Sequence, residues 1–216
     1  MNGKIKAVFF DFDGTLADTG SGIFNCVQKA LVAMGREPLP PETLRKFIGP
    51  PMFDSMKRYC GMSDDEARAG VKKYREFYGA DGLFDLRFYD GILELVGDVK
   101  KAGLKTAVAS SKPEQYISKL LEHFDLSDIF DTYAGTDMTG TNAGKDDLIR
   151  EAATKLGIED MSEIIMVGDR FYDTDAAEKV GAVPVGILYG YGVRDEFSEN
   201  ANVIEDVEEL RKFILG

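Results

Sequence analysis

The chain has 216 residues, of which 44% are hydrophobic, enough for one large domain or for a core with a smaller second lobe. Its 26 basic and 38 acidic residues give a net charge of −12, and no run of Lys and Arg interrupts this excess. Such a surface repels the phosphates of nucleic-acid polymers and anionic lipids, so we expect neither as a partner. The apolar stretch before Asp11 is too short for a signal peptide or a membrane span.

The two cysteines, Cys26 and Cys60, form no C-x-x-C pattern. A chain of this length folds without disulfides, so a reducing compartment suits it. We therefore predict a cytoplasmic protein, and the sequence gives no signal of its oligomeric state.

The first half of the chain reads as one strand followed by helices. An apolar run over residues 6–10 predicts a buried parallel strand that ends at Asp11. Helical spacing follows over residues 23–34, 42–47 and 52–59, and Ser63 with Glu66 forms a capping box that opens a helix to about Tyr78. Residues 20–80 are therefore predicted to be helical, without strands.

From residue 90 onward, helices and strands alternate. Strands are predicted at residues 105–109, 129–134, 163–167 and 183–188, with helices ending at 101 and spanning 114–124, 146–156, 173–180 and 207–215. This alternation predicts a three-layer α/β fold with a doubly wound parallel sheet. The helical segment interrupts it, so we predict a core of residues 1–16 and 85–216, a small inserted helical cap of residues 17–84, and hinges at residues 17–20 and 82–87.

Polar residues gather where four predicted strands end, which is where ligands bind in open parallel sheets. These segments are Asp11–Thr15, Ser110–Lys112, the loop of residues 135–145, and Gly168–Asp173. Asp11, Asp13 and Asp169 would bring three carboxylates together, which requires a cation. Oxygen ligands without His or Cys favour Mg²⁺.

The same strand ends supply groups that suit a phosphoryl substrate. Lys145 can balance the remaining negative charge and hold a phosphate oxygen, while the Ser110 hydroxyl and backbone N–H groups near Gly14 add donors. With its charge so neutralised, Asp11 can attack phosphorus and form an aspartyl phosphate. Asp13 can then serve as general acid toward the leaving group and as general base toward water.

The run D-x-D-G-T-L from Asp11 to Leu16 resembles the first motif of the haloacid dehalogenase superfamily. The whole chain resembles its phosphoglycolate-phosphatase-like branch, including a subgroup often labelled 5′-nucleotidase. The resemblance implies a mobile cap and a magnesium ion bound by Asp11, the backbone carbonyl of Asp13, and Asp169, with Asp173 in or near the outer coordination shell. Residues at the matching motifs are implied to bind phosphate: Gly14, Thr15, Ser110, Ser111 and Lys145.

One motif departs from the family pattern. The family lysine is commonly followed by Pro-x-Pro, whereas here Lys145 is followed by Asp146 and Asp147. Lys112 is therefore the alternative choice for the phosphate-binding lysine.

Each assignment also has a purely structural interpretation. Asp173 is suited to cap a helix, Ser110 to begin one, Lys145 to lie at a solvated helix end, and Arg170 to serve a turn or a salt bridge. Residues of the helical segment that are able to reach an anionic tail of a substrate are Lys46, Lys57, Arg58, Tyr74, Arg75 and Tyr78.

We predict a Mg²⁺-dependent phosphatase for a small phosphate monoester such as phosphoglycolate or a nucleoside monophosphate. A phosphomutase of the β-phosphoglucomutase type is the first alternative, and phosphate release would distinguish the two. A dehalogenase would have no use for Asp13 and Asp169. A non-catalytic module that binds a phosphate ligand is the third alternative, and the presence of every expected acidic residue argues against it.

Overall fold

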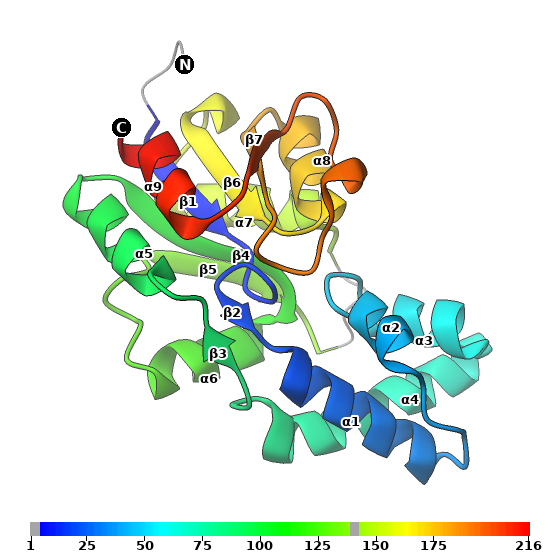
Figure 1. The fold of residues 1–216 in the computed structure, drawn as a ribbon. Coiled ribbons are helices and arrows are strands. Elements are labelled where there is room, and N and C mark those ends of the chain that lie inside the picture. Colours follow the sequence, from blue (N-terminus) through cyan, green and yellow to red (C-terminus); the bar gives the residue numbers. More distant parts are fainter. Residues whose placement is uncertain (1–4, 139–142) are drawn as a thin grey trace.

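The parallel sheet is the centre of the structure, a computed structural model that describes residues 5–138 and 143–216 (Figure 1). Within these residues six strands form one sheet in the order β5-β4-β1-β6-β7-β8, and all neighbours pair in parallel. The predicted doubly wound parallel sheet is confirmed. The strands are β1 (Ala7–Phe10), β4 (Lys105–Pro113), β5 (Thr132–Thr136), β6 (Ile164–Gly168), β7 (Val183–Ile187) and β8 (Asn202–Ile204).

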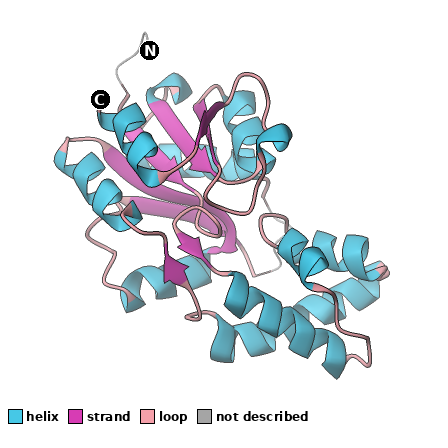
Figure 2. Cartoon of the chain, viewed as in Figure 1, coloured by secondary structure: helices cyan, strands magenta, loops and turns pink. Residues whose placement is uncertain are grey.

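Strand β1 lies in the middle of the sheet, between β4 and β6, and its side chains are buried on both faces. Val8 and Phe10 pack into one hydrophobic cluster, while Ala7 and Phe9 pack into the other, as the alternation of a strand requires. Helices therefore cover both faces (Figure 2). The first cluster contains α5 (Ile92–Lys101), α6 (Glu114–His123) and α9 (Val207–Leu215), and the second contains α7 (Lys145–Leu156) and α8 (Phe171–Val180).

A separate group of helices, residues 20–82, lies to one side of the sheet and is called the cap below (Figure 1). Its capping box is as predicted, because the Ser63 amide donates to Glu66 at 2.8 Å and the Ser63 hydroxyl accepts from the Glu66 amide. No strand occurs within these residues, all of which the structure describes. The elements are α1 (Gly20–Ala33), α2 (Pro41–Leu44), α3 (Met52–Cys60), α4 (Asp64–Phe77), the 3₁₀ helix η1 (Arg45–Phe47) and the π-helical turn η2 (Tyr78–Gly82).

Two short strands connect the cap to the sheet. β2 (Ala17–Asp18) and β3 (Arg87–Phe88) pair antiparallel, so the two segments predicted as hinges lie side by side. β2 falls inside the predicted cap range, residues 17–84. The domain boundaries and the hinge motion stay predictions.

The bounds of two strands and one helix differ from the predicted ones, and one strand of the main sheet was missed. Strand β4 continues to Pro113 rather than ending at residue 109. Strand β5 begins at Thr132 rather than residue 129, because the Ile129 carbonyl accepts the Thr106 hydroxyl at 2.5 Å in the loop before the strand. Helix α8 begins at Phe171 rather than residue 173. β8 was not predicted, because three residues are too short for a recognisable pattern.

Short 3₁₀ helices, η3 (Met161–Glu163) and η4 (Arg194–Glu196), connect the later elements. None of the helices in the described part of the chain is both long enough and apolar enough to span a bilayer.

Candidate active site

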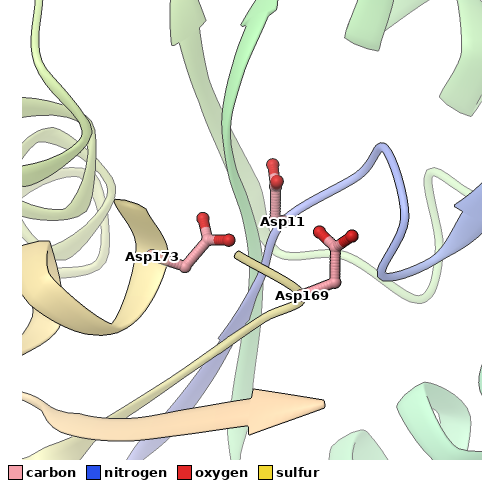
Figure 3. Close-up of side chains that lie close together, drawn as sticks. All are labelled: Asp11, Asp169 and Asp173. Carbon is pink, nitrogen blue, oxygen red and sulfur yellow. The ribbon is translucent and has the colours of Figure 1, made fainter. Parts of the chain in front are cut away.

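Three buried carboxylates meet at the carboxyl ends of β1 and β6. Asp11 follows β1 directly, Asp169 follows β6, and Asp173 lies in the first turn of α8. Each offers an oxygen, and these oxygens lie within 4.8 Å of one another. Figure 3 shows the three side chains close together, Asp11 and Asp169 after their strands and Asp173 on its helix. Because β1 and β6 are neighbours in a parallel sheet, their ends bring Asp11 and Asp169 together, as predicted. The third carboxylate of the cluster is Asp173 and not the predicted Asp13, whose Oδ1 lies beside Lys112.

Asp169 has an oxygen with no partner among the described residues. Its Oδ2 accepts the Tyr191 amide at 2.8 Å, but its Oδ1 is buried without a hydrogen bond or an ion pair. Burial, with the charges of Asp173 and Asp11, raises the pKa of Asp169 well above its usual range. A buried carboxylate oxygen beside two others is an arrangement that a hard divalent cation neutralises. These residues therefore fit a Mg²⁺ ion.

Gly14 allows the first loop to approach Asp169 closely. Its φ angle is +85°, and a Cβ atom here would lie 2.2 Å from Asp169 Oδ2. The Gly14 amide donates to the Ala17 carbonyl at 2.8 Å, so this particular N–H is already used within the fold. The contribution of Gly14 to the site is the space that its missing side chain leaves.

Lys145, the first residue of α7, joins two of the carboxylates. Its ammonium lies 2.9 Å from Asp11 Oδ1 and 2.7 Å from Asp173 Oδ1, and it donates to the Ala109 carbonyl at 3.1 Å. Its side chain is only 7% exposed, so the interpretation as a solvated helix end was wrong. Burial lowers the pKa of Lys145, but Asp11 and Asp173 more than offset this and the net pKa is raised.

Asp173 also caps its helix, since its carboxylate accepts the Arg170 amide at 3.2 Å. Burial raises the pKa of Asp173 to about 6, with Lys145 acting in the opposite direction and Asp11 in the same one. The structural interpretation of this residue therefore holds together with its place in the carboxylate cluster.

The alternative lysine, Lys112, also lies in the site but contacts a different carboxylate. Its ammonium is 2.9 Å from Asp13 Oδ1 and 2.8 Å from the hydroxyl of Tyr78, a cap residue. The two lysines therefore divide the acidic residues between them, with Lys145 beside Asp11 and Lys112 beside Asp13.

The remaining predicted phosphate-binding residues lie around the same strand ends. The Ser110 hydroxyl accepts the Lys112 amide at 3.2 Å, and Ser110 and Ser111 both line the cavity described next. Thr15 is buried, its hydroxyl has no hydrogen-bond partner among the described residues, and its carbonyl accepts the Tyr189 hydroxyl at 3.2 Å. In the loop of residues 135–145, positions 139–142 lie outside the described residues.

A cavity between the sheet and the cap opens onto Asp11 and Asp13. Of the cap residues predicted to reach a substrate, Tyr74, Arg75 and Tyr78 line it, whereas Lys46, Lys57 and Arg58 do not. Most of the cap lining is apolar or aromatic. The lining residues from the cap are Ile23, Phe47, Ile48, Gly49, Pro50, Pro51, Met52, Tyr74, Arg75 and Tyr78, and those from the core are Asp11, Asp13, Ser110, Ser111, Lys112, Pro113, Tyr116 and Thr136.

Arg170 forms the predicted salt bridge and also contacts the cap. Its Nε is 3.1 Å from Glu196, and its Nη1 donates to the Ile48 carbonyl at 2.6 Å. The residue next to Asp169 therefore helps to hold the cap in the observed position.

The sequence did not predict the role of the loop after β7. Tyr191 supplies the amide that binds Asp169, and its hydroxyl contacts Asp18 and accepts the Gly20 amide at 2.9 Å. A Cβ at Gly190 would lie 2.3 Å from the Gly14 carbonyl, so the loop needs glycine to pass this close. The repeated glycines of Tyr189–Gly192 were the available signal.

Comparisons with known proteins show the family of the chain. A family model described as haloacid dehalogenase-like hydrolase matches residues 8–187. A 5′-nucleotidase from Pseudomonas aeruginosa is 34% identical over 209 residues, which cover 96% of this chain and 94% of that protein. The tyrosine-protein kinase PtkA from Mycobacterium tuberculosis is 34% identical over 213 residues, 96% of this chain and 72% of the kinase. The crystal structure of a predicted phosphatase from Clostridium acetobutylicum matches with a TM-score of 0.93 and 35% identity, covering 99% of each chain.

The chain belongs to the haloacid dehalogenase-like hydrolase family. The predicted fold and the prediction of an enzyme of the phosphatase class are confirmed.

Proposed function

We propose that the enzyme hydrolyses a small phosphate monoester in a Mg²⁺-dependent reaction through an aspartyl phosphate on Asp11. The observation that carries this proposal is the Oδ1 of Asp169, which has no partner in the described part of the chain and is buried within 4.8 Å of oxygens of Asp11 and Asp173. Burying an unpaired charge is costly in free energy, so such a group needs a compensating partner. A bound cation is the compensation that the donor set suits.

Asp11 is the proposed nucleophile. It lines the cavity, and the ion pair with Lys145 at 2.9 Å reduces the repulsion between its carboxylate and an incoming phosphate anion. Attack by a carboxylate oxygen on phosphorus displaces the alkoxide of the substrate and leaves the phosphoryl group on Asp11. Water then attacks this phosphoryl group and regenerates the carboxylate.

Asp13 is the proposed general acid and base. It lies two residues from Asp11 and lines the same cavity, so it can give a proton to the departing alkoxide and later take one from water. Ser110, Ser111, Thr15, Lys145 and backbone near Gly14 are proposed to hold the phosphoryl oxygens.

The proposed magnesium ligands are Asp11, Asp169 and the backbone carbonyl of Asp13, with Asp173 next to them. When bound, the ion neutralises charge on the phosphoryl oxygens. Lys145 pairs with both Asp11 and Asp173 and so offsets their mutual repulsion, and the Tyr191 amide fixes the orientation of Asp169. These contacts preorganise the carboxylates before a substrate arrives.

The cap is proposed to exclude water and to select the leaving group. Its aromatic and apolar lining favours a small organic group, and Arg75 is the proposed anchor for a second anion. The name of the Pseudomonas relative makes nucleoside monophosphates a substrate class to test beside phosphoglycolate. Free cysteines at positions 26 and 60 suit the proposed cytoplasmic location.

The test is release of inorganic phosphate from a panel of phosphoglycolate, nucleoside monophosphates, sugar phosphates and 4-nitrophenyl phosphate, each with Mg²⁺ and with chelator. We expect release that stops in chelator and returns with Mg²⁺. Release that ignores the chelator would contradict the metal requirement.

Two further reactions separate the alternatives. Interconversion of sugar phosphates with a bisphosphate activator, without net phosphate release, would indicate the phosphomutase. Transfer from ATP to a tyrosine peptide would indicate the activity named for the mycobacterial relative.

A further inference from the structure

Lys112 is a buried cation in the site that the proposed reaction does not use. It lies near the end of β4, and its side chain is 3% exposed. Its ammonium contacts Asp13 Oδ1 at 2.9 Å, and within the described residues that oxygen has no other ion pair and no hydrogen bond. Lys112 is thus the group that fixes this end of the Asp13 carboxylate.

The second partner of Lys112 comes from the cap. Its ammonium donates to the Tyr78 hydroxyl at 2.8 Å, across 34 positions of the sequence. Tyr78 is 2% exposed and lies at the start of the π-helical turn that ends the cap. A buried ammonium requires such oxygen partners, because desolvation is otherwise uncompensated.

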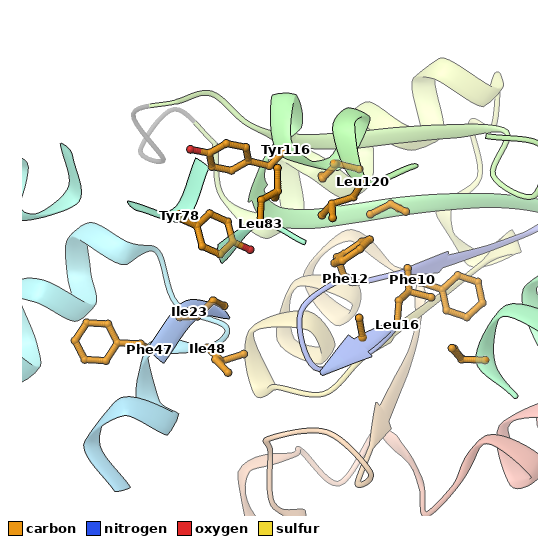
Figure 4. Packing of buried hydrophobic residues seen from close by; sticks show 14 of the residues in the cluster. Phe10, Phe12, Leu16, Ile23, Phe47, Ile48, Tyr78, Leu83, Tyr116 and Leu120 are labelled. Atoms are coloured by element: carbon orange, nitrogen blue, oxygen red, sulfur yellow. The ribbon is translucent and has the colours of Figure 1, made fainter. Parts of the chain in front are cut away.

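Aromatic packing fixes the Tyr78 ring between the cap and the core. The ring stacks on Tyr74 of the cap with a centroid distance of 5.1 Å, and it meets the edge of Tyr116 of the core at 5.4 Å. Figure 4 shows Tyr78 and Tyr116 adjacent at this junction. The Lys112 ammonium also lies 5.0 Å from the centroid of the Tyr78 ring. Any displacement of the cap that moves Tyr78 therefore removes an oxygen partner from Lys112.

We propose that Lys112 is a positioning residue that orients Asp13 for proton transfer, and that Tyr78 makes this orientation depend on the position of the cap. The inference rests on the proposed function, because it assigns Lys112 a role in that reaction. Lys112 acts on Asp13 and not on the phosphoryl group, which Lys145 serves. A seated cap then completes the proton-transfer group at the same time as it covers the substrate.

The experiment uses 4-nitrophenyl phosphate, whose leaving group departs without a proton. Transfer of its phosphoryl group to Asp11 needs little from Asp13, whereas hydrolysis of the aspartyl phosphate needs Asp13 as base. For Lys112→Met we expect kcat to fall about tenfold or more, kcat/KM to change less than about threefold, and a burst of nitrophenol to appear. For Tyr78→Phe, which keeps the ring, we expect the same pattern with a smaller fall.

The double variant should be no slower than Lys112→Met, because Tyr78 acts through Lys112. Lys155→Met is the matched control: this lysine pairs with Glu114 at 2.9 Å and Glu151 at 2.8 Å, outside the cavity. It should leave both parameters unchanged. Equal falls in kcat and kcat/KM for Lys112→Met would overturn the proposal, since they would indicate a contact with the phosphoryl group or general damage to the site. Additive falls in the double variant would overturn the role of Tyr78.

A crystal structure of Lys112→Met gives a readout that does not need activity. The proposal requires the Asp13 side chain to leave its present orientation, and an unchanged orientation would overturn it. Absence of turnover by the unmodified enzyme on every phosphate ester would refute the proposed function, while the orientation of Asp13 would still decide this inference.

Discussion

Replacing Asp169 by Asn should stabilise the metal-free protein while it removes the response to Mg²⁺. The substitution keeps the shape of the side chain and an oxygen that can accept the Tyr191 amide. It removes a charge whose oxygen lies within 4.8 Å of oxygens of Asp11 and Asp173. At that distance two unit charges repel by roughly 3 kcal/mol at an effective dielectric constant of about 20.

Lys145 offsets part of this repulsion, so we expect a net gain of about 2 kcal/mol in the free energy of unfolding near neutral pH. For a chain of this length this corresponds to an increase of about 4–8 °C in Tm. The free energy of unfolding of the unmodified protein should rise by about 2.7 kcal/mol when Mg²⁺ is at 100 times its Kd, and that of the Asn variant should rise much less. Thermal unfolding with chelator and across a Mg²⁺ titration measures both effects.

The difference in stability between these two proteins should depend on pH. Burial and the neighbouring carboxylates raise the pKa of Asp169 in the folded state, so protonation of Asp169 favours folding. This contribution to the free energy of unfolding is complete below the unfolded-state pKa of about 3.9, and it is lost as the pH rises through the folded-state pKa. In chelator, the advantage of the Asn variant should therefore shrink as the pH is lowered.

Asp131→Asn is the matched control, because Asp131 accepts the Thr106 amide at 2.9 Å and is paired with Lys100 at 3.4 Å. Burial raises the pKa of Asp131, but these contacts more than offset it and hold the pKa below its usual range. This control should lower the stability and keep the response to Mg²⁺. The reasoning would be refuted if Asp169→Asn were less stable than the unmodified protein in chelator, or if Mg²⁺ stabilised both equally.

Three further substitutions test the other parts of the site. Asp11→Asn should abolish phosphate release, because it removes the proposed nucleophile, and substantial residual turnover would exclude Asp11 from that role. Asp13→Asn should slow turnover by about 10²–10⁴-fold and keep the stabilisation by Mg²⁺, since its proposed metal contact is the backbone carbonyl; a titration followed by Tm would reveal a loss of metal binding instead. Lys145→Met should cost about 3–5 kcal/mol of unfolding free energy in chelator, because it leaves Asp11 and Asp173 unpaired, and denaturant unfolding that shows no loss would contradict the buried ion pairs.

The sequence was sufficient for the parallel sheet and for the meeting of Asp11 with Asp169, because both follow from local patterns. Apolar runs of strand length predict buried strands, and polar residues at the ends of neighbouring strands must meet. Asp11 and Asp169 could therefore be placed together, whereas Asp173 and not Asp13 is the third member of the cluster.

Contacts between distant segments could not be predicted in this way. The pairing of Lys112 with Tyr78 depends on how the cap sits against the core, and the reach of Tyr191 to Asp169 depends on the path of a loop. Neither leaves a periodic signal in the sequence. The short strands β2, β3 and β8 were missed for a related reason, because their two or three residues are defined by their partners and not by their own composition.

The most direct test of the central claim is to detect the phosphoryl group on Asp11. The enzyme would be mixed with 4-nitrophenyl phosphate and Mg²⁺, quenched with acid within milliseconds, digested and examined by mass spectrometry, with Asp13→Asn included to slow the hydrolysis of the intermediate. We predict one phosphoryl group on the peptide that contains Asp11, removed by hydroxylamine and absent from Asp11→Asn. Turnover with an unmodified Asp11 peptide at every quench time, or with the phosphoryl group on another residue, would contradict the account.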